Sequence, residues 1–265
     1  MSVPSTTSTS RSPGDVTALA LLQRWDDQQA AYISRREERF EVLLDVLAAT
    51  APADGLVLDL ACGPGSISAR VASRFPHMRC VGVDLDPALL HLGRDAAAER
   101  GDSDRVGFLD ADLHDPRWTE VLGGARPDVV LSSTALHWLP APTLVRVYAD
   151  LGRLLAPGAT FLNADHLRAS SGRTSFEDLA RRDDEATQAR AHAAGVEDWD
   201  TWFSALSAVP RYADDLRERS ARFADRPPNP DLSPAFHVEA LRVAGFAEAG
   251  VVWQHWDDYV VHGRR

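Results

Sequence analysis

A short apolar run that ends at two closely spaced glycines constrains the fold of this chain more than any other feature. The run Val57–Leu60, in Val57-Leu-Asp-Leu-Ala-Cys-Gly-Pro-Gly65, is too short for a helix and is bounded by turn residues, so it predicts a buried parallel strand. Gly63 and Gly65 have no Cβ atom, so the loop that they form can approach a ligand closely. A helix over about residues 66–74 would point its N-terminal amides at that ligand. Taken alone, the pattern fits a plain strand-to-helix turn equally well.

Two further apolar runs each end in an acidic residue, at the positions where a nucleotide-binding βαβ unit has acidic residues. Cys80-Val-Gly-Val-Asp84 ends in an acid about 20 residues after the glycines, the interval at which a carboxylate accepts hydrogen bonds from ribose hydroxyls. Val106-Gly-Phe-Leu-Asp110 leads into Ala111-Asp112-Leu113. The three segments in this order are far more specific than any one of them alone.

Together these segments resemble the class I (Rossmann-like) S-adenosylmethionine-dependent methyltransferases. The run Leu136-His-Trp-Leu-Pro140 is similar to the small-molecule branch that includes trans-aconitate methyltransferase. The resemblance covers about residues 20–165 and 234–262, and Ala61 departs from the glycine that many relatives carry. It implies an α/β fold with a doubly wound seven-stranded sheet ordered 3-2-1-4-5-7-6, the last strand antiparallel, an N-terminal helix and a helical cap inserted after strand 5.

The resemblance also implies which residues bind the cofactor, S-adenosylmethionine. Asp84 would bind the ribose, and Asp112, rather than Asp110, would accept a hydrogen bond from the adenine amino group. A helix before the first strand would bring Tyr32 near the sulfonium and Arg36 near the carboxylate, although an amphipathic packing helix with a solvated arginine explains that segment too. The full expected set is Tyr32, Arg36, Asp59, Ala61, Gly63, Gly65, Asp84, Leu85, Asp112, Leu113, Ser132 and Thr134.

Candidates for catalysis lie after the fourth and fifth predicted strands. His137 follows the fourth strand, and Asp165-His166 ends the fifth, where a carboxylate beside an imidazole could remove a proton from a hydroxyl or an acidic carbon. Structural alternatives remain open, because His137 could begin a helix against the cofactor and Asp165 could be a helix N-cap. Contacts with the substrate are expected from Trp138, Trp199, Trp202 and His237.

The remaining pattern alternates between strands and helices. Strands are expected near 56–60, 80–84, 106–110, 127–132 and 160–163, and helices near 66–74, 88–100, 116–122 and 142–155. This alternation predicts a parallel sheet with helices on both faces. Asp86-Pro87 should begin a helix with Asp86 as its N-cap. A helix over 234–245 and antiparallel strands at 249–255 and 258–262 should complete the sheet.

Local composition indicates the domain boundaries. Residues 1–14, rich in Ser, Thr and Pro, are predicted to be a disordered tail. Residues 15–265 are predicted to form the methyltransferase domain, with a helical pattern over 15–50 and a helical cap over 167–232. The cap would act as a substrate lid, and its tryptophans would give an apolar wall. Dimerisation or ordinary core packing is the competing use for these aromatic residues.

Charge and composition narrow the class of partner. A net charge of −11, with arginines spread among acids, argues against nucleic acid. The absence of lysine excludes a P-loop lysine or a Schiff base. Cys62 and Cys80 predict small buried side chains and no metal site. No apolar stretch approaches the roughly 20 residues of a membrane span. We therefore expect a cytoplasmic protein, monomeric or homodimeric, with a small-molecule partner and no membrane contact.

The sequence thus predicts transfer of a methyl group from S-adenosylmethionine to O, N or C of a small molecule, in bacterial specialised metabolism. The protein would mainly align the nucleophile with the methyl carbon, and a base is needed only when the nucleophile is protonated. A protein that binds the cofactor without transferring methyl, as a regulator, a partner subunit or a cofactor-assisted cyclase, keeps the same motifs. An NAD-dependent oxidoreductase fits less well, because Gly63-Pro-Gly65-Ser-Ile-Ser68 lacks the third glycine of that fingerprint.

Overall fold

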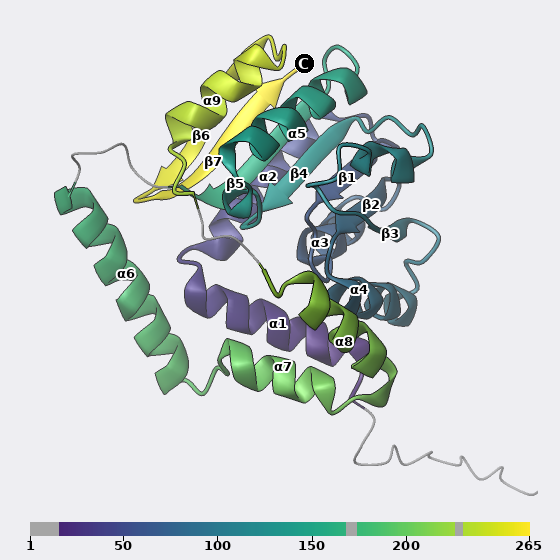
Figure 1. Ribbon diagram of the computed structural model, residues 1–265, viewed down its shortest axis with the longest axis vertical. Coiled ribbons are helices and arrows are strands. Elements are labelled where there is room, and N and C mark those ends of the chain that lie inside the picture. Colours follow the sequence, from purple (N-terminus) through teal and green to yellow (C-terminus); the bar gives the residue numbers. More distant parts are fainter. Residues whose placement is uncertain (1–15, 168–173, 226–229) are drawn as a thin grey trace, which may run out of the picture.

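A computed structural model describes residues 16–167, 174–225 and 230–265, and its centre is a seven-stranded sheet (Figure 1). The strand order β3-β2-β1-β4-β5-β7-β6 confirms the predicted order. The predicted disordered tail, residues 1–14, lies outside the described residues. The strands are β1 (Leu56–Leu60), β2 (Arg79–Asp84), β3 (Val106–Asp110), β4 (Val129–Ser133), β5 (Thr160–His166), β6 (Glu248–His255) and β7 (Asp258–Arg264).

The direction of the strands places the functional motifs at one edge of the sheet. Strands β1 to β5 are parallel to one another, whereas β7 is antiparallel to both β5 and β6. The carboxyl ends of parallel strands meet at the same edge. The glycine loop, the acids that end β2 and follow β3, and the segment after β4 therefore converge there.

Helices cover both faces of the sheet (Figure 1), and an apolar core lies between the helices and the sheet on each face. One core lies under α5 and α9, and the other under α2, α3 and α4. Most apolar residues of the inner strands are fully buried, which is why these runs do not alternate with polar residues. The helices are α1 (Ala18–Tyr32), α2 (Arg36–Thr50), α3 (Ser66–Arg74), α4 (Pro87–Arg100), α5 (Ala141–Leu154), α6 (Thr174–Ala193), α7 (Trp199–Ser207), α8 (Ala213–Arg222) and α9 (Pro234–Val243).

Two predicted helices differ from the structure, and one predicted cap is confirmed. The helical pattern over 15–50 forms two helices, because the chain turns between Tyr32 and Arg36 with Arg35 in a left-handed conformation, φ 52°. The segment predicted as a helix near 116–122 is a short 3-10 helix, Trp118–Leu122. Asp86 caps α4 as predicted, since its Oδ1 accepts hydrogen bonds from the amides of Ala88 and Leu89.

Helices α6, α7 and α8 lie between β5 and α9 in the chain and pack near the N-terminal helix α1 (Figure 1). Helices α6 and α7 contact α1, and α8 contacts α4. Trp202 of α7 is fully buried against Trp25, and its Nε1 donates a hydrogen bond to the carbonyl of Leu21 at 3.1 Å. Core packing therefore explains Trp202.

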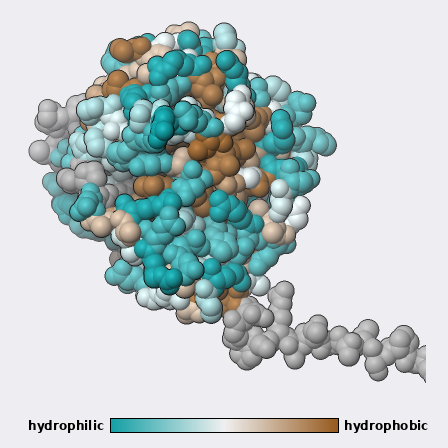
Figure 2. Space-filling view, turned by 45° about the vertical axis from the view of Figure 1, so that its right-hand side comes forward, coloured by the Kyte–Doolittle hydropathy of each residue, from teal (hydrophilic) through white to brown (hydrophobic). Residues whose placement is uncertain are grey.

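The surface shown in Figure 2 is mainly hydrophilic, with hydrophobic residues gathered in a hollow near its centre. No helix among the described residues is both long and apolar enough to cross a membrane. Cys62 and Cys80 are buried and unbridged, in agreement with the predicted small buried side chains. Burial raises the pKa of the Cys62 and Cys80 thiols, so neither is a ready thiolate.

The contact between α5 and α9 leaves no room for a side chain at Gly152. A Cβ atom there would lie 2.1 Å from the carbonyl oxygen of Ala244, a backbone atom that cannot move alone. Gly→Ala within a helix ordinarily stabilises it by roughly 1 kcal/mol. At this position steric overlap should reverse that sign.

Gly152→Ala is expected to lower the free energy of unfolding by about 1–3 kcal/mol, because overpacking must separate the two helices. Urea denaturation followed by circular dichroism would measure the change. Gly107→Ala in β3 is the matched control, since nothing lies within 4 Å of a Cβ atom there. A Gly152→Ala variant as stable as this control would contradict the close helix contact.

Candidate active site

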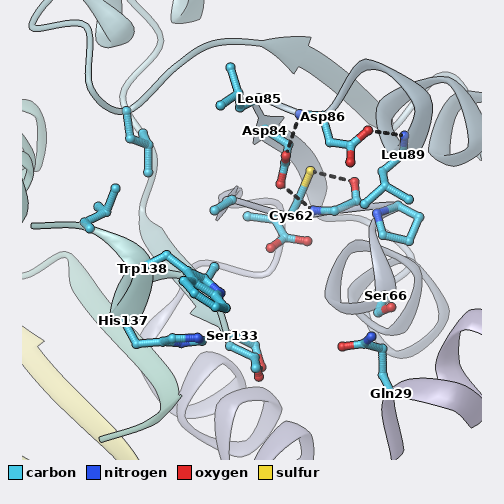
Figure 3. Close-up of a pocket in the computed structure, with 18 of the residues that line it drawn as sticks. Gln29, Cys62, Ser66, Asp84, Leu85, Asp86, Leu89, Ser133, His137 and Trp138 are labelled. Atoms are coloured by element: carbon cyan, nitrogen blue, oxygen red, sulfur yellow. Dashed lines mark hydrogen bonds between the residues drawn. The ribbon is translucent and has the colours of Figure 1, made fainter. Parts of the chain in front are cut away.

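A cavity of about 1010 Å³ lies at the carboxyl edge of the parallel strands. Its lining comes from the loop after β1, the end of β2, the segments after β3 and β4, and helices α1 and α8. In Figure 3, His137 and Trp138 lie on one side of it, and Asp84, Leu85 and Asp86 lie on another. The volume is at the upper end of the range for small-molecule sites, roughly 300–1,000 Å³.

The two glycines of the loop after β1 have different roles. A Cβ atom at Gly63 (φ 55°) would meet only side-chain atoms of Leu89 and Trp25, at 3.8 and 3.9 Å, and Gly63 lines the cavity. A Cβ atom at Gly65 (φ 83°) would lie 2.6 Å from the ring of Phe108. Gly63 therefore keeps the cavity open, whereas Gly65 allows the loop to pack on the sheet.

Asp84 ties the glycine loop to the end of β2. Its Oδ2 accepts a hydrogen bond from the Gly63 amide at 2.7 Å, and its Oδ1 accepts one from the Asp86 amide at 2.8 Å (Figure 3). Burial raises the pKa of Asp84 to about 6 against these hydrogen bonds. In this setting, further hydrogen-bond donors from a ligand, such as vicinal hydroxyls, stabilise the ionised form of a carboxylate that lines the cavity.

Asp59 and Asp112 occupy contrasting environments in the same lining. Asp59 is buried and accepts hydrogen bonds from the amide and the hydroxyl of Ser68, at 3.1 and 2.7 Å. Burial raises the pKa of Asp59 to about 7, against those hydrogen bonds. Asp112 is exposed and holds its own loop by accepting a hydrogen bond from the His114 amide at 2.8 Å. Asp110, the alternative to Asp112, is occupied by an ion pair with Arg222.

Tyr32 and Arg36 reach the cavity from the break between α1 and α2. The Tyr32 side chain is 37% exposed, so its ring is available to a ligand. The Arg36 guanidinium is buried and donates a hydrogen bond to Asp26 at 2.9 Å. Its Nη1 is buried without a hydrogen-bond acceptor among the described residues. This orphaned donor in the lining fits an anionic group such as a carboxylate.

His137 is oriented by Asp165 from behind. The ring Nδ1 lies 2.6 Å from Asp165 Oδ1, and the His137 amide donates to Asp165 Oδ2 at 3.0 Å. Burial alone would raise the pKa of Asp165. The Coulombic interaction and the hydrogen bond with His137 outweigh burial, so the pKa of Asp165 is lowered. With Nδ1 engaged, His137 can present Nε2 to the cavity, which is the arrangement of a general base and its orienting carboxylate.

The predicted pairing of Asp165 with His166 is wrong. Consecutive side chains of a strand point to opposite faces, and β5 continues to His166, so Asp165 is not a helix N-cap either. The ring of His166 instead lies between Asp257 at 3.1 Å and Asp258 at 3.4 Å. Burial lowers the pKa of His166, but these two carboxylates outweigh it and raise the pKa to about 10.

Further acidic residues gather beside His166. Asp184 of α6 lines the cavity, and one ligand atom from each of His166, Asp184 and Asp257 lies within 4.8 Å of the others. Burial raises the pKa of Asp184 to about 6, and the nearby Asp257 and Asp258 add to the shift. This end of the cavity is therefore strongly acidic.

Five predicted site residues lie outside the lining, and one of them is Asp165, which contacts His137. Gly65 packs against Phe108, and Ser132 donates its hydroxyl hydrogen to the Leu60 carbonyl at 2.8 Å. Trp202 and His237 were predicted to contact the substrate, and their placement corrects this, because both are fully buried away from the cavity. His237 Nδ1 lies 2.6 Å from the Tyr148 hydroxyl, and burial lowers the pKa of His237 to about 4.

Most of the other predicted residues meet at the cavity. Asp165 lies directly behind its lining, in contact with His137. The residues in the lining itself are Tyr32, Arg36, Asp59, Ala61, Gly63, Asp84, Leu85, Asp112, Leu113, Thr134, His137, Trp138, His166 and Trp199.

Sequence reasoning missed the contribution of the inserted helices and of the last strand. Asp184 of α6, Arg219 and Arg222 of α8, and Asp258 of β7 all line the cavity. Arg219 pairs with Asp86 at 2.6 Å and Arg222 with Asp110 at 2.7 Å. The spacing of three residues between the arginines places both on one helix face, and it was the only local signal for their role.

Comparison with known proteins agrees with this geometry. Residues 57–158 match the family model described as a methyltransferase domain. A trans-aconitate 2-methyltransferase from an Azoarcus species is 33% identical over 135 residues, which cover 51% of this chain and 47% of the relative. Another from Methylobacterium nodulans is 29% identical over 195 residues, which cover 70% of this chain and 69% of the relative. The matched region thus spans about half the length of the first of these relatives.

The fold is also shared with solved structures. An O-methyltransferase family protein from Burkholderia thailandensis superposes with a TM-score of 0.56 at 19% identity, over 94% of this chain and 58% of that one. This likeness concerns the fold alone. The matched domain, the order of the sheet and the three motifs together are similar to those of the class I, S-adenosylmethionine-dependent methyltransferases.

Proposed function

We propose that this chain transfers a methyl group from S-adenosylmethionine to a small-molecule acceptor. One observation carries the proposal: a single cavity joins the glycine loop and Asp84 at one part of its lining to the oriented His137 at another. The first part provides features for holding a nucleotide-like cofactor. The second provides a base within the same cavity.

Several residues in the lining fit the cofactor. The open side of Gly63 leaves room for the cofactor backbone, and the Asp84 carboxylate is placed to accept hydrogen bonds from the ribose hydroxyls. The orphaned Nη1 of Arg36 suits the methionine carboxylate, and Asp59 would lie beneath the amino group. When bound, S-adenosylmethionine supplies a methyl carbon on a sulfonium, which is open to in-line attack by a nucleophile.

His137 and Asp165 would act on the acceptor. The Nε2 atom of His137 would take the proton of an acceptor hydroxyl as the oxygen attacks. Asp165 would hold the ring by its Nδ1 and stabilise the charge that the ring gains. A protonated hydroxyl needs this help, whereas a carboxylate or a thiolate does not.

The acceptor and the setting are proposed from chemistry and resemblance. The net charge of −11 and a cavity of small-molecule size favour a small molecule over nucleic acid. We assign the chain to bacterial specialised metabolism in the cytoplasm, as a monomer or a homodimer. A cofactor-binding protein that transfers no methyl is disfavoured by the oriented base, and an NAD-dependent oxidoreductase by the missing third glycine.

Calorimetric titration with S-adenosylmethionine, S-adenosylhomocysteine and NAD tests the cofactor. We expect micromolar binding of the first two and none of NAD. Asp84→Ala should weaken binding of S-adenosylmethionine by more than about tenfold, because a hydrogen bond to a charged group is worth about 1.5–3 kcal/mol.

Asp115→Ala is the matched control for Asp84→Ala, since Asp115 is exposed, pairs with Arg117 and lies outside the lining. It should bind like the wild type. Thermal melts would show whether Asp84→Ala remains folded. Binding of NAD alone would replace the methyltransferase proposal with an oxidoreductase, and unchanged affinity in a folded Asp84→Ala would remove Asp84 from the site.

Asp165→Asn tests the proton-transfer step. For a hydroxyl acceptor found in a metabolite panel, kcat should fall by roughly a hundredfold or more, the range of general-base catalysis. Mass spectrometry of the methylated product would measure it. Affinity for S-adenosylhomocysteine should stay within about twofold of wild type, since Asp165 lies behind the lining. Loss of affinity together with rate would instead indicate a structural role for Asp165.

A further inference from the structure

We infer that the acceptor carries a cationic amine and that the carboxylate of Asp184 binds it. The inference rests on the proposed methyl transfer and adds the chemical class of the acceptor. It depends on the charges at the end of the cavity where α6, β5 and the turn between β6 and β7 meet.

Acidic residues from three separate segments converge at this end. Asp183 and Asp184 come from α6, Asp257 comes from the turn after β6, and Asp258 begins β7. Asp184 and Asp258 line the cavity directly, beside His166 of β5. Because these segments are far apart in the sequence, the tertiary fold alone brings the four carboxylates together.

The basic side chains found nearby among the described residues are already engaged by three of the four acids. Arg39 of α2 is buried and pairs with Asp258 at 3.0 Å. His166 lies between Asp257 and Asp258, and His255 of β6 lies 3.3 Å from Asp183.

Among the described residues, 16–167, 174–225 and 230–265, Asp184 has neither a hydrogen bond nor an ion pair with another residue. It is partly buried, and its cationic neighbour His166 is shared with Asp257 and Asp258. Although burial raises the pKa of Asp184 to about 6, the group remains largely ionised at neutral pH. An unpaired carboxylate that lines a cavity favours a cation there.

An anionic acceptor would meet the opposite situation. Both arginines of α8 in the described lining already have carboxylate partners, Arg219 with Asp86 and Arg222 with Asp110, and Arg36 is the residue proposed to bind the carboxylate of the cofactor. A carboxylate ligand placed near Asp184 would face like charges without a free cation. The acceptor end is thus poorly suited to an acid.

The geometry favours an ammonium group over a metal ion. Both ring nitrogens of His166 face carboxylates, so the ring acts as a charged donor and has no lone pair for a metal. Tyr32 and Trp138 each expose about a third of their side chains and line the same cavity. Such rings stabilise organic cations through cation–π contacts.

Three phenols that differ in charge test the inference. Tyramine is cationic, tyrosol is neutral and 4-hydroxyphenylacetate is anionic, while their rings and chain lengths match. Each would be titrated calorimetrically into the full chain saturated with S-adenosylhomocysteine. We expect tyramine to bind at least tenfold more tightly than the other two. In Asp184→Asn this preference should fall below about threefold.

Glu185→Gln is the matched control, since Glu185 is the next residue of α6 and its side chain is exposed. It should keep the wild-type preference for tyramine. Equal binding of the three phenols, or no detectable binding of any at millimolar concentration, would overturn the inference. A preference that persists in Asp184→Asn would remove Asp184 from it.

Two further titrations separate the possible failures. Mn²⁺ is titrated into the same protein, and binding that Asp184→Asn abolishes, without a preference for tyramine, would overturn the inference in favour of a metal. S-adenosylhomocysteine is titrated alone first. If it does not bind, the proposed function fails; if it binds and tyramine is not preferred, only the class of the acceptor is wrong.

Discussion

The carboxylate of Asp84 is the interaction on which the candidate site depends. It holds the amides of Gly63 and Asp86, so one side chain fixes the loop after β1 relative to the helix after β2. The Asp86 carboxylate in turn caps α4 and receives Arg219 from α8. The glycine loop after β1, helix α4 and helix α8 are therefore connected through two nearby acids.

The fold could be predicted because its signals are local. The apolar runs that end in glycine or acid correspond to β1, β2 and β3, and the expected N-cap at Asp86 was correct. The resemblance supplied the order of the sheet, including the reversed strand. The break between α1 and α2 was not predicted, because the left-handed conformation of Arg35 does not change the periodicity of apolar residues in the sequence.

The acceptor side could be predicted only in part, because its contacts join distant segments. His137 and Asp165 were both named, but their pairing follows from the alternation of side chains along β5 and from the proximity of β4. Tryptophans in the inserted segment suggest a substrate wall, yet Trp202 is buried in the packing on α1, and of the two tryptophans in this segment only Trp199 lines the cavity. Asp184 and Asp258 carry no motif and become functional candidates only through their tertiary neighbours.

Helix α8 is joined to the sheet edge mainly by charge. None of its residues is buried, and Arg219 and Arg222 hold it to Asp86 and Asp110, with the Arg219 guanidinium 4.1 Å from the ring centre of Phe203. The Arg222–Asp110 pair is partly exposed and weakens as ionic strength rises, whereas the largely buried Arg219–Asp86 pair and the apolar cores are screened much less. Salt should thus weaken one of the two ion-pair links of α8 at concentrations that leave the sheet intact, so the position of α8 beside the cavity and the global stability of this protein respond to different properties of the solvent.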